Sequence, residues 1–168
     1  MRQEDRVQVE VLGVRRQGPG DQVVVLLLDV EGRRLLPVVV GVAEGSAIAT
    51  AQAGVLGPRP MTHDLLVSVL EATGRTADRV EIHSLVDGVF HASLVLDDGT
   101  VVDSRASDAV AVAVRVPCPV VCAREVLDIA GLDVEQPEPE KQVAQFRSFL
   151  DTVTPDDFQT GPGDEGRG

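Results

Sequence analysis

The chain has 168 residues, of which 43% are hydrophobic and 25% are charged, and this composition excludes a wholly disordered protein. Fifteen lysines and arginines stand against 27 aspartates and glutamates, and the net charge of −12 argues against a protein that binds nucleic acid by simple electrostatic attraction. No apolar run approaches the roughly 18 residues of a membrane span and no signal peptide is recognisable, so we expect a cytoplasmic protein that does not enter a membrane.

The N-terminal part of the sequence predicts three strands joined by short turns, which is the pattern of an antiparallel meander. Valines alternate with polar residues over 7–11, as in a half-buried strand. The second and third strands are predicted at 23–29 and 34–41, and each follows a turn that contains glycine.

Two helices are predicted next. An alanine-rich segment favours a short helix at 44–53, and the sequence Gly-Pro-Arg-Pro at 57–60 then interrupts regular structure. Thr62 is the expected N-cap of a helix over 63–73. Four apolar residues share one face of that helix and are expected to pack against the core: Leu65, Leu66, Val69 and Leu70.

A second antiparallel unit follows. Three strands joined by Asp-Gly turns are predicted at 80–85, 90–96 and 100–102. The helix predicted at 106–114 is apolar nearly all round and should be buried, with Ser104 or Ser107 as its N-cap. A short strand at 119–122 and a helix at 124–130 complete this part.

These elements together predict an α+β fold. It has a large mixed, mostly antiparallel sheet with buried helices packed on it, and an additional C-terminal amphipathic helix. We expect one domain over 1–132, a linker over 133–139, the C-terminal helix within 140–158 and a disordered tail over 159–168.

Two polar turns that open helices carry the side chains best suited to chemistry. The first contains Arg59, Thr62, His63 and Asp64, and the second contains Ser104, Arg105, Ser107 and Asp108. An imidazole can act as a general base near neutral pH, a carboxylate can hold a divalent cation, and an arginine can bind a phosphate. Each turn also fits a structural interpretation, in which the carboxylate stabilises the helix dipole and the arginine forms an ion pair. A weaker candidate is Glu44, at a strand-to-helix junction.

Five segments, in order along the chain, resemble motifs of the bifunctional nuclease domain family. Residues 36–48 (LPVVVGVAEGSAI) resemble its LPIWIG, EA and AI elements, 59–66 (RPMTHDLL) resemble RPLTHDLL, 87–90 (DGVF) resemble DGTF, and 105–115 (RASDAVAVAVR) resemble RPSDAIALALR. Residues 145–158 are similar to the ending of actinobacterial members. The departures include Gly45, where the family has alanine, and Ala106, where it has proline.

The resemblance implies an α+β fold, a homo-oligomer, and a nuclease that hydrolyses phosphodiester bonds in DNA and RNA. In this interpretation nucleic acid is the substrate, Mg²⁺ or Mn²⁺ assists the reaction, and no organic cofactor is used. Carried onto this sequence, it gives catalytic roles to His63, Asp64, Arg105 and Asp108, substrate binding to Arg59, Thr62 and Ser107, and metal binding to Glu44, Asp64 and Asp108.

The alternative is a non-catalytic oligomeric binding or regulatory module with the same fold, in which these side chains are helix caps and ion pairs. The two interpretations differ in the geometry that they require. Carboxylates that cluster around a shared open space favour the metal site, whereas dispersed or mutually paired groups favour the module.

Overall fold

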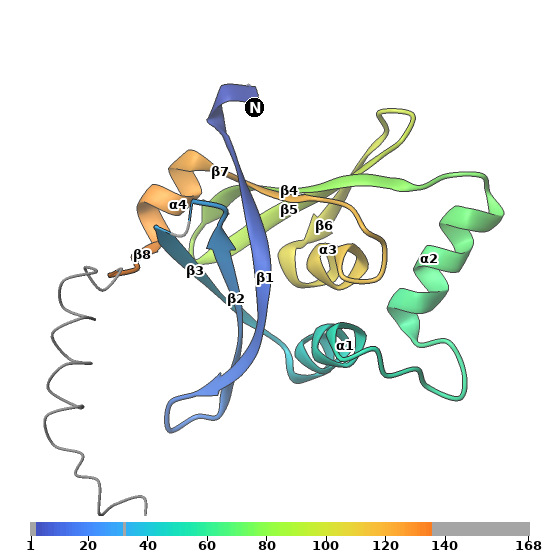
Figure 1. Ribbon diagram of the computed structural model, residues 1–168, viewed down its shortest axis with the longest axis horizontal. Helices are drawn as coiled ribbons and strands as arrows, with labels where there is room; N and C mark the ends of the chain where they lie inside the picture. Colours follow the sequence, from blue (N-terminus) through green and yellow to red (C-terminus); the bar gives the residue numbers. More distant parts are fainter. Residues whose placement is uncertain (1–2, 32, 136–168) are drawn as a thin grey trace, which may run out of the picture. The chain divides into compact units, whose positions relative to one another are not determined.

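The computed structural model describes residues 3–31 and 33–135 (Figure 1). The expected C-terminal helix over 140–158, the tail, and the linker beyond residue 135 lie outside the described residues. Within the described residues, no helix is both long enough and apolar enough to cross a membrane.

Eight strands form one sheet within the described residues. They are β1 (Arg6–Gln17), β2 (Gln22–Asp29), β3 (Arg34–Val40), β4 (Ala77–Val86), β5 (Val89–Leu96), β6 (Val101–Arg105), β7 (Val120–Ala123) and β8 (Leu132–Asp133). The same part of the chain forms a short 3-10 turn at Gln3–Asp5 and four α-helices, which are α1 (Val42–Gln52), α2 (Thr62–Ala72), α3 (Ala106–Ala113) and α4 (Arg124–Ala130).

The sheet joins two antiparallel meanders. The strand order is β6-β5-β4-β7-β1-β2-β3-β8, in which β7 lies between the meander β4–β6 and the meander β1–β3. The β4–β7 pair is parallel and the other recorded pairs are antiparallel, so the predicted mixed, mostly antiparallel sheet is confirmed. β6 continues to Arg105, three residues beyond the predicted end of that strand, and leads directly into α3.

Helix α3 lies at the centre of the core, as its apolar sequence predicts. Ala106 and all five residues from Ala109 to Ala113 are buried. The helix contacts β4, β5 and β6 of the sheet and also α1 (Figure 1). Because small alanine side chains alternate with valines, the helix can approach both neighbours closely, and this fixes the position of its N-terminal turn.

Helix α1 packs closely against the sheet at Gly45. A Cβ atom built on this residue would lie 2.4 Å from Cγ1 of Val23 on β2, so the space between helix and strand accommodates only hydrogen. On the neighbouring turn Ile48 is fully buried. This close approach holds the first turn of α1, and therefore Glu44, against the sheet.

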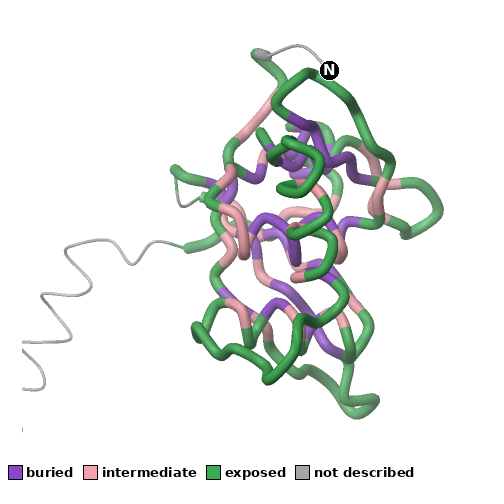
Figure 2. Tube along the Cα trace, turned by 90° about the vertical axis from the view of Figure 1, so that its right-hand side faces the viewer, coloured by how far each residue is buried: buried purple, intermediate pink, exposed green. Residues whose placement is uncertain are grey.

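The apolar face predicted for α2 is wrong in part. Leu65, Leu66 and Val69 are exposed, with 57% of the Leu65 surface accessible, whereas Leu70 is partly buried against the core. The residues that face the core are instead buried His63 and partly buried Val67 and Leu70. Their spacings of four and three residues place them on one face of the helix. α2 faces the viewer in Figure 2, where most of it is coloured as exposed.

Both predicted N-caps are also wrong. Met61 occupies the cap position of α2 and Thr62 is the first helical residue, while Arg105 occupies the cap position of α3 in place of Ser104 or Ser107. The backbone N–H of Met61 donates to the Asp64 carboxylate at 2.9 Å, so the first turn of α2 is held from within the helix.

We expect Gly45→Ala to reduce the free energy of unfolding by about 1–3 kcal/mol, because the added methyl group must displace Val23 or shift the whole helix. Urea denaturation of the full chain measures the change. Gly20→Ala is the matched control, since nothing lies within 4 Å of a Cβ atom at that exposed turn. Equal stability of the two variants would contradict the close packing of α1 on β2.

Candidate functional site

The first turns of three helices bring the predicted site residues together. Glu44 lies in the first turn of α1, His63 and Asp64 lie in the first turn of α2, and Asp108 lies in the first turn of α3 with Arg105 at its cap. α3 contacts both other helices. A strand leads directly into α3, and a single residue separates β3 from α1, so the sheet positions both of these turns.

Four of these side chains form a continuous chain of hydrogen bonds, here called the Arg105 cluster: Glu44, His63, Arg105 and Asp108. Arg105 Nε donates to Asp108 Oδ2 at 2.6 Å and Arg105 Nη2 donates to Glu44 Oε1 at 3.0 Å. His63 Nε2 lies 3.0 Å from Asp108 Oδ1. Asp108 therefore contacts a guanidinium through one oxygen and an imidazole through the other.

The Arg105 cluster is graded in exposure, from a nearly buried imidazole to an exposed guanidinium. The side chain of Arg105 is 67% exposed, whereas that of His63 is 11% exposed. Burial raises the pKa of Asp108, but the hydrogen bonds from Arg105 and His63 outweigh it, so the pKa lies below its usual value. The hydrogen bonds to Asp108 and then Glu44 raise the pKa of Arg105. Asp108 is thus an anion and Arg105 a cation at neutral pH.

Asp64 belongs to a second group, here called the Asp64–Arg115 pair. Arg115 Nε donates to Asp64 Oδ1 at 2.7 Å, and its two terminal nitrogens donate to the carbonyl oxygens of Ala111 and Ala47 at 2.7 and 3.1 Å. The side chain of Arg115 is only 10% exposed. The hydrogen bond from the Met61 backbone, and then that from Arg115, lower the pKa of Asp64.

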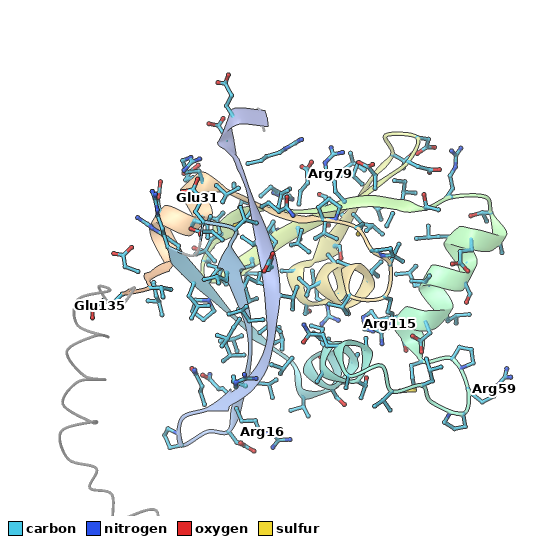
Figure 3. The ribbon with its side chains drawn as sticks, in the orientation of Figure 1. Arg16, Glu31, Arg59, Arg79, Arg115 and Glu135 are labelled. Carbon is cyan, nitrogen blue, oxygen red and sulfur yellow. The ribbon has the colours of Figure 1, made fainter. Side chains whose placement is uncertain are left out.

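Arg115 is a functional candidate that the sequence analysis did not select. It ties the C-terminal end of α3 to α1 and α2, and Figure 3 shows it between those helices. The available signal was its position: a single charged residue closes an apolar run from Ala109 to Val114. A charge next to so much buried surface requires partners, and here they come from sequence-distant elements.

Three predicted substrate-binding residues stand apart from both groups. Arg59, Thr62 and Ser107 take no part in the hydrogen bonds of the Arg105 cluster or of the Asp64–Arg115 pair. Arg59 extends outward from the loop between α1 and α2 (Figure 3). Their role as substrate contacts stays a prediction.

The carboxylates of the site are arranged around arginines. Arg105 lies between Glu44 and Asp108, and Arg115 holds Asp64, so cations already stand beside all three expected metal ligands. Within the described residues, no three His, Cys, Asp or Glu side chains converge in a group that could hold a metal ion. This arrangement does not fit a preformed Mg²⁺ or Mn²⁺ site, and metal dependence stays a prediction.

A cavity of about 590 Å³ adjoins the site. It is lined by α1, the loop that follows α1, the first turns of α2 and the end of α3. Its lining is mostly small and apolar, and Asp64 and Arg115 are the charged residues in it.

Comparison with known proteins places these motifs in a family. The profile of the bifunctional nuclease domain matches residues 25–135. Two proteins of Mycobacterium tuberculosis, from strains CDC 1551 and H37Rv and each described as uncharacterized, are 40% identical to this chain over 160 residues. Each alignment covers 90% of this chain and 98% of the mycobacterial protein.

We expect Asp64→Ala to reduce the free energy of unfolding at pH 7 by about 1–3 kcal/mol, because the carboxylate holds the first turn of α2 and pairs with the nearly buried Arg115. The folded pKa of Asp64 is lower than its unfolded value near 4, so this stabilisation is present above about pH 4 and is lost as the pH falls through the folded pKa. Urea denaturation of the wild type and of the variant, at pH 7 and at pH 3, measures the difference in stability at each pH.

Glu71→Ala is the matched control for Asp64→Ala, because Glu71 is an exposed carboxylate further along the same helix. We expect its effect to be small at both pH values. A deficit of Asp64→Ala that stays the same at pH 3 would contradict the stabilising role of the ionised carboxylate.

Proposed function

The chain belongs to the bifunctional nuclease domain family, and we propose that it cleaves phosphodiester bonds in nucleic acid with the Arg105 cluster. One observation carries this proposal. The imidazole of His63 on α2 lies in direct hydrogen-bond contact with a carboxylate at the start of α3, and that carboxylate also accepts from the exposed guanidinium of Arg105. These are the groups that a phosphodiester cleavage needs for proton transfer and for stabilisation of charge on the phosphate.

His63 is the general base in this proposal. The Asp108 carboxylate accepts a hydrogen bond from Nε2–H and thereby leaves Nδ1 as the ring nitrogen that takes a proton. Nδ1 removes one proton from the attacking water molecule as the water oxygen forms the new bond to phosphorus. The departing 5′ oxygen takes a proton from solvent as its bond breaks, and Asp108 stabilises the imidazolium meanwhile.

Arg105 binds the phosphate in this proposal. Its guanidinium has five N–H donors, of which two contact Asp108 and Glu44, so three remain for a phosphate. A guanidinium matches the oxygens of a phosphate, and its charge stabilises the extra negative charge of the transition state. The two carboxylates fix its position before the substrate arrives.

No step is assigned to a metal ion here. The guanidinium of Arg105 stands between Glu44 and Asp108, and the reaction above uses only the side chains of this chain. Cleavage of nucleic acid by the purified chain in Mg²⁺, in Mn²⁺ and in EDTA, which removes metal ions, tests the expected metal dependence.

The alternative of a non-catalytic binding or regulatory module is favoured by a different observation. Each carboxylate of the site is already paired with an arginine, which is what helix ends held by ion pairs require. In that case the purified protein does not cleave nucleic acid, and substitutions in the Arg105 cluster change only the stability of the fold.

Cleavage of labelled single-stranded RNA and DNA by the full chain tests the proposal. We expect His63→Gln and Arg105→Gln each to slow cleavage by about 100-fold or more, since each removes a group needed in the transition state. His83→Gln and Arg16→Gln are the matched controls, because both residues are exposed and far along the chain from the site. Circular dichroism verifies that each variant is folded.

The outcome separates the two functions. Cleavage that survives equally in all four variants comes from a contaminant or from another site and contradicts the assignment to the Arg105 cluster. No cleavage by the wild type in EDTA, Mg²⁺ or Mn²⁺ would favour the module.

The homo-oligomer implied by the resemblance is also part of the proposal. The exposed leucines of α2 support it, because adjacent exposed apolar side chains mark contact surfaces. We expect light scattering to give a mass that is a multiple of 17.8 kDa, and Leu66→Lys to lower it. Leu12→Lys, at an exposed leucine on β1, is the control, and a wild-type mass of one chain would contradict the oligomer.

A further inference from the structure

The first turns of α1 and α2 contribute residues both to the lining of the cavity and to the Arg105 cluster. Ala43 lines the cavity and Glu44, the next residue of α1, belongs to the cluster. Likewise Asp64 lines the cavity and His63, the preceding residue of α2, belongs to the cluster. Successive helical residues point about 100° apart, so a ligand in the cavity lies beside the cluster without occupying it.

The cavity presents hydrogen-bond acceptors in an apolar surrounding. Each oxygen of Asp64 accepts one hydrogen bond from the protein, from Met61 or Arg115, and a carboxylate has about four acceptor positions. One position on each oxygen therefore stays available, and the Asp64 side chain is 39% exposed. The unused positions of Asp64 are acceptors, so a ligand that binds them must supply hydrogen-bond donors.

The remaining lining suits the faces of a flat ring. Ala47, Ala51, Val67 and Met61 offer aliphatic surface, and a volume of about 590 Å³ is in the usual range of small-molecule sites. A ring with two adjacent N–H groups would satisfy both free positions of the carboxylate at once.

We propose that this cavity binds the guanine base of the nucleic-acid substrate, with Asp64 accepting hydrogen bonds from the N1–H and N2–H groups. Guanine alone among the four RNA bases has two adjacent donors on its Watson–Crick edge. Adenine and cytosine place an acceptor beside their amino group, which the carboxylate repels. The choice of a nucleobase rests on the proposed function, while the demand for paired donors rests on the cavity itself.

Binding of mononucleotides to the full chain tests this proposal without any cleavage step. Calorimetric titration compares guanosine, inosine and adenosine 5′-monophosphate. We expect guanosine monophosphate to bind at least about 10-fold more tightly than either of the others, since inosine lacks the N2 amino group and a bidentate contact is worth about that factor. Asp64→Asn should abolish the preference.

A second pair of variants keeps Asp64 intact. Ala51→Leu places a larger side chain in the cavity and should lower the affinity for guanosine monophosphate by about 10-fold or more. Ala49→Leu changes an exposed position of the same helix that does not line the cavity and should leave binding unchanged.

Several results would overturn the proposal. Equal affinity for the guanosine and adenosine nucleotides would remove the base assignment, and unchanged binding in Ala51→Leu would place the ligand elsewhere. Cleavage that depends on His63, without guanosine monophosphate binding, refutes the guanine cavity and leaves the proposed nuclease intact. Guanosine-selective binding without cleavage supports the cavity and counts against the nuclease.

Discussion

Helix α3 is buried on nearly every side because its apolar sequence lies against four strands and two helices, and arginines stand at both of its ends. Arg105 at the N-terminal end holds Glu44 and Asp108, and Arg115 beyond the C-terminal end holds Asp64. The core packing of one short helix therefore sets the positions of both groups of the site. A disturbance of this packing would affect both groups, since each contains an arginine at one end of α3.

The two arginines serve different purposes because their exposure differs. Arg115 is nearly buried and has its donors directed at protein oxygens, so it joins three helices. Arg105 reaches solvent between two carboxylates that use only two of its five N–H donors, so it is the arginine of the site that the proposal assigns to the phosphate. In the proposal a chain with a net charge of −12 contacts the phosphate through this one oriented guanidinium.

Much of the fold follows from local patterns in the sequence. The strands, the Asp-Gly turns and the burial of α3 follow from alternation, turn chemistry and an all-apolar helix, and these are properties of a few adjacent residues. Three of the four residues that converge, His63, Arg105 and Asp108, could be predicted because two helix starts carry recognisable polar motifs, and the fourth, Glu44, comes from the start of α1. The pairing of Asp64 with Arg115 was not predictable in the same way, because it joins residues 51 positions apart. The inward face of α2 could not be predicted either, because this helix has apolar side chains on more than one side. The face that is buried depends on where α3 lies.

The insertion of β7 between the two meanders has a consequence for how the chain folds. Within each meander the paired strands are consecutive in the chain, so they can pair through local contacts as soon as the last of the three strands is present. β1 and β4, however, meet only through Val120–Ala123, which follows both meanders in the chain. During synthesis each half therefore has an open strand edge until this late segment emerges, and closure of the sheet brings together residues that are more than a hundred positions apart. The docking of one four-residue strand is therefore the step that joins the two meanders into a single sheet.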